Sequence, residues 1–163
     1  GRDLRLRFRM TDVTDEWNPP HGFDHVYFNV FFDFPGVPGK RFFPKLGYAR
    51  SDFDFNAGFL LYGWDMRSFG AEDSSPDAYG KPLAGDVAAK ADVARNLVEF
   101  TFSSSFFAST ADFSGTKVFI STWDGYLGEP RAVADKKEDW NFYTTEGPGA
   151  KVPKVYDHVL LEL

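Results

Sequence analysis

The chain has 163 residues, a net charge of −6 and no cysteine. This length suits one domain with a single core, and the lack of cysteine excludes disulfides, thiol catalysis and thiolate metal sites. Nucleic-acid binding needs clustered Lys and Arg, so 24 acidic against 18 basic residues argue against such a partner. No apolar run is long enough to predict a membrane span.

Two strands are predicted in the first third of the chain. Residues 4–10 alternate strictly between apolar residues and arginine, which is typical of a half-buried strand. Residues 25–33 form the second strand, with Val26, Phe28, Val30 and Phe32 on one face and a mixed set on the other. Two prolines and two glycines in residues 34–39 then predict a turn.

The middle of the chain predicts more strands and one long loop. Residues 51–64 alternate again and indicate a central strand or a pair of strands. Residues 65–86 hold prolines, glycines and several Asp and Ser, so we expect a surface excursion. Residues 87–93 and 97–102 flank Ala94-Arg95-Asn96, which predicts a hairpin with Asn96 in a left-handed conformation.

The last third predicts a short helix and three strands. Residues 103–105 are serines that can cap a helix running to residue 111. Strands are expected at residues 117–123, 131–134 and 158–163. About eight strands and one short helix predict an all-β fold, an antiparallel β-sandwich with jelly-roll or immunoglobulin-like layers, that takes residues 1–163 as a single module.

Aromatic residues beside polar ones are the most informative group for function. They occur as Trp64-Asp65, as Trp123-Asp124-Gly125-Tyr126 and as Trp140-Asn141, each at a strand end or in a loop. A flat ring can cover the apolar face of a sugar while Asp or Asn bonds its hydroxyls. These residues are therefore the candidate ligand contacts, although a single indole at a strand end is more often a plug that closes a sandwich.

Catalytic and metal signatures are weak. His21, His25 and His158 form no recognised motif, and Glu99 and Asp124 do not stand out from solvated carboxylates, which leaves a small hydrolase with two carboxylates as a remote alternative. Residues 52–63 begin like an EF-hand loop but lack its sixth-position Gly and final Glu. No cofactor is required, and Asp52, Asp54 and Asn56 remain candidates for a calcium site of another geometry.

Three stretches resemble a known family. They are Leu4-Arg5-Leu6-Arg7-Phe8, residues 25–36 (His-Val-Tyr-Phe-Asn-Val-Phe-Phe-Asp-Phe-Pro-Gly) and residues 118–125 (Val-Phe-Ile-Ser-Thr-Trp-Asp-Gly). The chain resembles the C-terminal module of glucodextranases and pullulanase-type enzymes, a DOMON-like, family 9-like carbohydrate-binding β-sandwich. The resemblance implies an accessory module of a secreted bacterial enzyme that acts on α-glucans, with calcium present in some relatives and no hydrolysis by the module itself.

The leading expectation is a non-catalytic carbohydrate-binding module at the C-terminal part of a larger secreted glycoside hydrolase. Its partners would be an α-glucan or another polysaccharide and the catalytic domain of the same precursor, and its location would be secreted, periplasmic or at the bacterial cell surface. The alternative is a purely structural module that attaches to another domain or to the cell surface, and it predicts a dry apolar patch.

Overall fold

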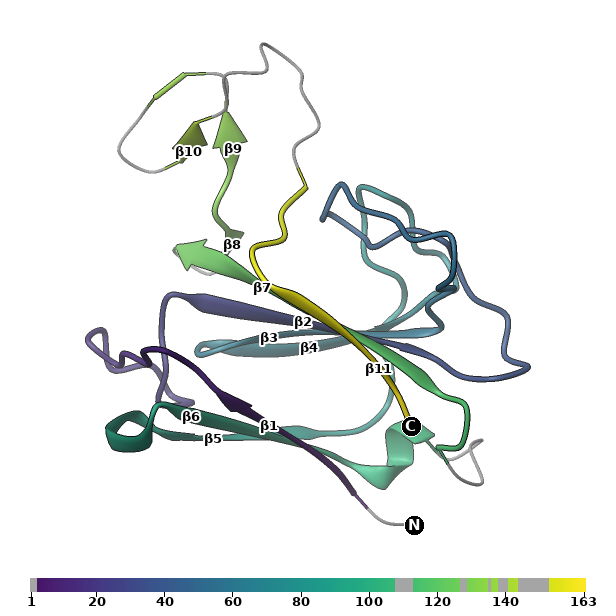
Figure 1. The fold of residues 1–163 in the computed structure, drawn as a ribbon, viewed down its shortest axis with the longest axis horizontal. Coiled ribbons are helices and arrows are strands. Elements are labelled where there is room, and N and C mark those ends of the chain that lie inside the picture. Colours follow the sequence, from purple (N-terminus) through teal and green to yellow (C-terminus); the bar gives the residue numbers. More distant parts are fainter. Residues whose placement is uncertain (1–2, 108–112, 127–128, 135, 138–140, 144–152) are drawn as a thin grey trace.

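The computed structural model describes residues 3–107, 113–126, 129–134, 136–137, 141–143 and 153–163. These residues form two antiparallel sheets stacked face to face, which confirms the all-β sandwich (Figure 1). The smaller sheet has the order β1-β6-β5 and contains β1 (Leu4–Arg9), β6 (Leu97–Phe102) and β5 (Val87–Asp92). Its hairpin β5–β6 turns through a 3₁₀ helix (Val93–Arg95) and Asn96, whose φ of 54° is the left-handed conformation that was predicted.

The larger sheet carries the long strands and has the order β11-β7-β2-β3-β4. The strands are β2 (Val26–Asp33), β3 (Ala57–Tyr62), β4 (Asp65–Gly70), β7 (Lys117–Tyr126) and β11 (His158–Glu162). Three short strands follow β7: β8 (Glu129–Pro130), which pairs with its end, and the parallel pair β9 (Val133–Ala134) and β10 (Phe142–Tyr143).

The main core lies between the two sheets. The even positions of β2 and β6 meet there, and Phe28 contacts Phe100 with ring centroids 5.2 Å apart. Val118 and Ile120 of β7 join the same cluster, as the alternation predicted. The sandwich is therefore held by tightly packed aromatic and β-branched side chains, which suit a pleated surface.

A second core covers the opposite face of the larger sheet. Phe31 of β2 and Phe119 of β7 pack there against aromatic residues of the segment between β2 and β3, with Phe43 only 4.4 Å from Phe119, and Tyr27 and Trp123 belong to the same cluster. Figure 1 shows these long connections folded over the sheet. The parity that set Trp123 apart from Ile120 is thus confirmed, and β2 and β7 are buried on both faces.

Three local predictions need correction. Residues 51–54 form a turn and loop instead of a strand, because Phe53 and Phe55 are buried from an extended segment outside the sheet. The excursion at 65–86 begins with a strand, β4, because residues 62–65 make a tight turn where a Cβ on Gly63 would lie 1.7 Å from the Phe23 carbonyl oxygen. The helix after residue 103 is a 3₁₀ turn (Ser104–Phe107), and residues 108–111 lie outside the described part.

Candidate functional site

An open cleft of about 450 Å³ lies where β2 and β11 begin and β7 ends. Strand order places these three ends side by side, since β7 pairs with both neighbours. The lining residues are Met10, His25, Val26, Thr122, Trp123, Asp124, Tyr156 and Asp157. The cleft therefore combines aromatic rings with carboxylate, hydroxyl and imidazole groups.

The buried carboxylate of Asp24 holds the chain segment that leads into β2 beside the cleft. One of its oxygens accepts the backbone N–H of Trp17 at 2.9 Å, and the other accepts the hydroxyl of Thr14. His25 follows with a φ of 60°, an uncommon conformation for a residue with a Cβ. Together these contacts fix the loop that carries Trp17 and turn His25 toward the cleft.

Two tryptophans form an exposed aromatic surface beside His25. Trp17 is 44% exposed and Trp64 37%, and their ring centroids are 6.1 Å apart. The imidazole of His25 lies 4.2 Å from the Trp17 ring, while Tyr62 supports Trp64 from below at 4.9 Å. We call Trp17, Trp64 and His25 the aromatic platform; because His25 also lines the cleft, the two features are continuous.

The far wall of the cleft is built around Trp123. This indole is only 5% exposed, and its Nε1 donates to the carbonyl of Arg131 at 2.9 Å. The ring of Tyr156 covers it at 4.6 Å and leaves its own outer face in solvent. Burial, followed by the nearby Asp124 carboxylate, raises the pKa of the Tyr156 phenol above its ordinary value.

An ion pair supplies the polar rim. The Nε of Arg131 lies 2.6 Å from the Oδ2 of Asp124, and the backbone N–H of Arg131 donates to the Asp124 carbonyl at 2.9 Å. Both side chains are about one-fifth exposed (19% and 21%); Asp124 lines the cleft, and Arg131 holds its carboxylate in place.

The structure brings some of the predicted ligand contacts together. Trp123 and Asp124 line the cleft, and Trp64 lies on the aromatic platform. Asp65 begins β4 and is bound to Arg67 at 2.6 Å, next to Trp64 along the chain. The side chain of Tyr126 and all of Trp140 lie outside the described residues.

Sequence reasoning did not select Trp17, His25, Tyr156 and Asp157. Trp17 precedes Asn18, the same pairing of an aromatic with a polar residue that selected Trp140. The same criterion could therefore have selected Trp17. His25 and Asp157 enter the cleft only because strand register aligns the ends of β2 and β11. That alignment depends on contacts distant in sequence.

The candidate calcium ligands all have protein partners. Arg50 binds Asp52 at 3.0 and 2.9 Å, and Arg41 binds Asp54 at 2.8 and 2.9 Å, and hydrogen bonds from these guanidinium groups hold the pKa of both carboxyls below the ordinary value. The Asn56 side chain accepts the N–H of Phe34 at 2.9 Å. In the described part of the chain no three His, Cys, Asp or Glu residues gather as a metal site. Calcium therefore stays a prediction, and a calcium ion would compete with Arg50 and Arg41 for the two carboxylates.

Two further hollows lack the combination seen in the cleft. One, of about 270 Å³, runs along β4 beside Tyr79. The other, of about 210 Å³, lies on the outer face of the smaller sheet and is lined mainly by charged side chains. Neither joins two exposed aromatic rings to a polar rim, so the cleft with its aromatic platform is the best candidate site.

Comparison with known proteins identifies a family for the chain. No curated protein matches the chain, and within its described residues we find no helix with the length and apolar character needed to cross a bilayer. A family model described as the C-terminal binding module, SLH-like, of glucodextranase matches residues 1–162. The chain therefore belongs to the family of SLH-like C-terminal binding modules of glucodextranase.

Proposed function

We propose that the protein is a non-catalytic accessory module that binds carbohydrate through the cleft and the aromatic platform. The observation that carries the proposal is the pair of exposed indoles, Trp17 and Trp64, joined through His25 to a polar cleft. Membership in a family of binding modules supports the same reading.

The chemistry of the site fits a sugar. The C–H face of a pyranose is apolar and would stack on the platform rings, while its hydroxyls need donors and acceptors in the plane of the ring. Asp124 and Tyr156 line the cleft and supply such groups, and Arg131 is paired with Asp124 behind them. A cleft open to solvent suits an extended polymer better than a small enclosed ligand.

The family name supports a more specific form of this proposal. The module would serve a secreted glycoside hydrolase that acts on α-glucans, and it would hold that enzyme on its substrate or at the cell surface. Its covalent partner would be the catalytic domain of the same precursor. Hydrolysis by the module itself gains no support from membership in a binding-module family.

Calorimetry tests the proposal with matched variants. Maltooligosaccharides and isomaltooligosaccharides are titrated into the wild-type chain and into Trp17→Ala and Trp64→Ala, and we expect each variant to bind about tenfold more weakly, a loss of about 1.4 kcal/mol. Val37→Ala is the control, because Val37 is equally exposed (42%) but lies beyond the opposite end of β2. Absence of binding to any glucan, other polysaccharide or monosaccharide at millimolar concentration contradicts the proposal.

A separate observation favours attachment to another polypeptide as a second function. Val159, Leu161 and Leu163 on and just after β11 are exposed apolar side chains. None of the three lines the sugar cleft, which adjoins this surface through Met10 after β1 and Asp157 before β11. Loss of sugar binding would leave this second function as the main one.

A further inference from the structure

The two sheets of the sandwich differ in width on the side that carries both chain ends (Figure 1). β1, the edge strand of the smaller sheet, lies over β2, since Phe8 contacts Phe28 with ring centroids 4.8 Å apart. The larger sheet continues past β2 through β7 to its own edge strand, β11. Because Val118 and Ile120 of β7 are still buried between the sheets, the larger sheet extends beyond the cover of the smaller one at β11.

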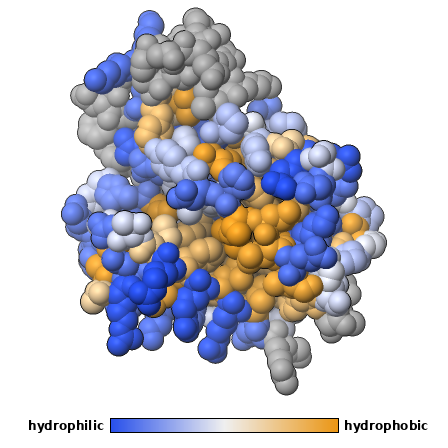
Figure 2. Space-filling view, viewed as in Figure 1, coloured by the Kyte–Doolittle hydropathy of each residue, from blue (hydrophilic) through white to orange (hydrophobic). Residues whose placement is uncertain are grey.

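Strand β11 exposes side chains on the face of the larger sheet that carries the core between the sheets. Val159 and Leu161 pair across the ladder with Ile120 and Val118, which belong to the core between the sheets, so all four share one face. Val118 and Ile120 are buried, yet Val159 is 44% exposed and Leu161 37%. Figure 2 shows hydrophobic residues gathered on this side of the molecule, bordered by hydrophilic side chains. Within the described residues, no strand of the smaller sheet covers Val159 and Leu161 of β11.

The main-chain edge of β1 points into the same space. The N–H of Met10 donates to the carbonyl of Asn96 at 2.9 Å, so even-numbered residues of this strand bond to the β6 side. By the alternation of an antiparallel ladder, the N–H and C=O groups of Arg5, Arg7 and Arg9 face the free edge. A further strand can pair with β1 there and cover β11.

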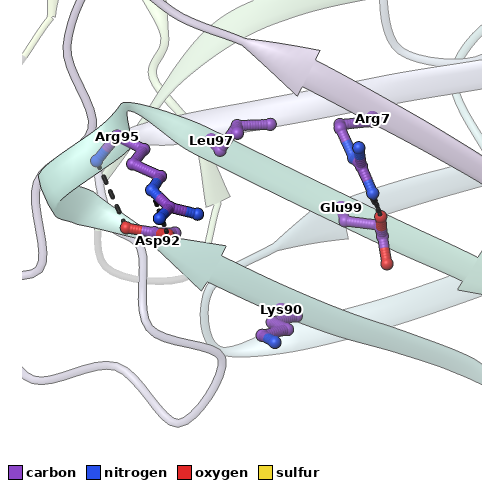
Figure 3. A pocket seen from close by; sticks show the side chains of 6 residues that line it. All are labelled: Arg7, Lys90, Asp92, Arg95, Leu97 and Glu99. Atoms are coloured by element: carbon purple, nitrogen blue, oxygen red, sulfur yellow. Dashed lines mark hydrogen bonds and ion pairs between the residues drawn. The ribbon is translucent and has the colours of Figure 1, made fainter.

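The arginines of β1 define the charge that this strand should carry. Figure 3 shows Arg7 turned toward Glu99 of β6, at 2.6 Å, and Arg95 beside Asp92. Arg5 and Arg9 instead stand opposite Thr101 and Leu97, which are uncharged. Among the residues that the structure describes, neither Arg5 nor Arg9 has an ion pair, although the charge of Arg5 helps to lower the pKa of Glu99, so both can meet carboxylates on an added strand.

From these contacts we infer that the free edge of β1 binds an extended segment of a partner polypeptide in which apolar and acidic residues alternate. The apolar side chains cover Val159 and Leu161, and the acidic ones stand beside Arg5 and Arg9. The main-chain bonds give affinity and the alternation gives register, as in other cases of strand addition. This inference does not depend on sugar binding.

A second copy of the chain is a poor occupant of this edge. Pairing of β1 with β1 of another molecule places arginine across from arginine, and like charges directly opposite each other destabilise a ladder. The arginines thus discourage self-association, a common role of edge-strand charges. The uncovered Val159 and Leu161 are not explained by that role, since protection of an edge favours polar residues.

A peptide titration on the full chain tests the inference. The probes are fluorescein-labelled heptapeptides of alternating glutamate and valine, the same peptide with lysine in place of glutamate, and a shuffled glutamate peptide. Fluorescence anisotropy should show the alternating glutamate peptide binding about tenfold more tightly than the other two. Amide hydrogen exchange of Arg5, Arg7 and Arg9 should slow when it binds, because these N–H groups enter the new ladder.

Three variants make the test specific. Arg5→Glu should abolish most of the preference for the glutamate peptide, since Arg9 alone then opposes the new carboxylate, whereas Lys90→Glu, on the same outer face but on the far strand β5, should keep the preference of the wild-type chain. Val159→Ser should weaken binding and leave the fold intact, because its side chain is already exposed. Any of four results would overturn the inference. Two concern affinity: equal binding of the glutamate and lysine peptides to the wild-type chain, and no binding of any peptide at millimolar concentration. Two concern hydrogen exchange: binding that leaves the three amides unprotected, and protection that appears only through dimerisation.

Discussion

Two of the surfaces where apolar side chains are exposed among the described residues differ in chemistry. At the cleft the emerging side chains are aromatic, and they stand beside an ion pair and hydroxyl groups. At the open edge they are aliphatic, and they stand beside unpaired main-chain groups of β1. Exposed apolar side chains alone therefore do not identify the kind of ligand. Aromatic rings with polar neighbours suit a sugar, whereas aliphatic side chains beside a free strand edge suit a peptide.

Both surfaces depend on a sheet that is packed on two faces, and core truncation tests this most strongly. Phe28→Ala removes a ring from the core between the sheets, and Phe119→Ala removes one from the core under the long loops. Each should lower the free energy of unfolding by about 3–5 kcal/mol, measured by urea denaturation. A loss below about 1 kcal/mol for Phe119→Ala would mean that the loops do not form a packed layer.

The next largest effect concerns the support of the aromatic platform. Asp24→Ala leaves the N–H of Trp17 and the hydroxyl of Thr14 without their acceptor, which should cost about 1–3 kcal/mol. It should also weaken sugar binding, because the Trp17 loop loses its anchor. Asp33→Ala, a carboxylate at the other end of β2, is the comparison: if it weakens sugar binding equally, the Asp24 contacts have no special role.

A crossed experiment separates the two surfaces. Trp64→Ala should weaken oligosaccharide binding about tenfold and leave the affinity for the alternating glutamate peptide unchanged. Leu161→Ser should do the reverse and change the free energy of unfolding by less than about 0.5 kcal/mol. Calorimetry and anisotropy on the same protein samples check both expectations, and a variant that affects both ligands would show that the two surfaces are coupled.

The smallest expected effect is the pH dependence of stability that comes from the ion pair between Arg7 of β1 and Glu99 of β6. The hydrogen bond from Arg7 holds the pKa of Glu99 below its ordinary value of 4.5. The pair therefore stabilises the fold fully above that pH, and its contribution is lost as the pH falls through the lowered pKa. Glu99→Gln should remove a small part of the loss of stability at acid pH, measured as the shift of the denaturation midpoint between pH 5 and pH 3. If the variant and the wild-type chain lose stability equally, this pair does not contribute to the pH dependence.

Much of the fold was predictable from sequence, because period-two alternation identifies a buried face directly. The prediction succeeded at β1, β2, β6 and β7, where apolar residues recur at every second position. It was wrong at residues 51–54, where Phe53 alternates with aspartates outside any sheet, because burial under a loop leaves the same pattern as burial in a strand. It also missed β4, whose Ser68 and Gly70 give a weak strand signal.

The candidate site was less predictable than the fold. Trp64 and Trp123 share a chemical signature in the sequence, yet the structure exposes the first and encloses the second. Their difference comes from Tyr156 and Phe142, which reach Trp123 from the end of the chain. His25 became part of the site through the register of β2 with β7, and register is a property of pairs of strands.

The most direct test of the central claim follows the indole N–H signals of the tryptophans by NMR during titration with isomaltotriose and maltotriose. We expect the signals of Trp17 and Trp64 to shift in proportion to saturation, and that of Trp123 to move little because its N–H is bonded to the Arg131 carbonyl. Signals of Trp17 and Trp64 that stay fixed up to saturating sugar, or shifts confined to residues around Tyr79 on β4's side, would contradict the assignment of the cleft and its platform as the sugar site.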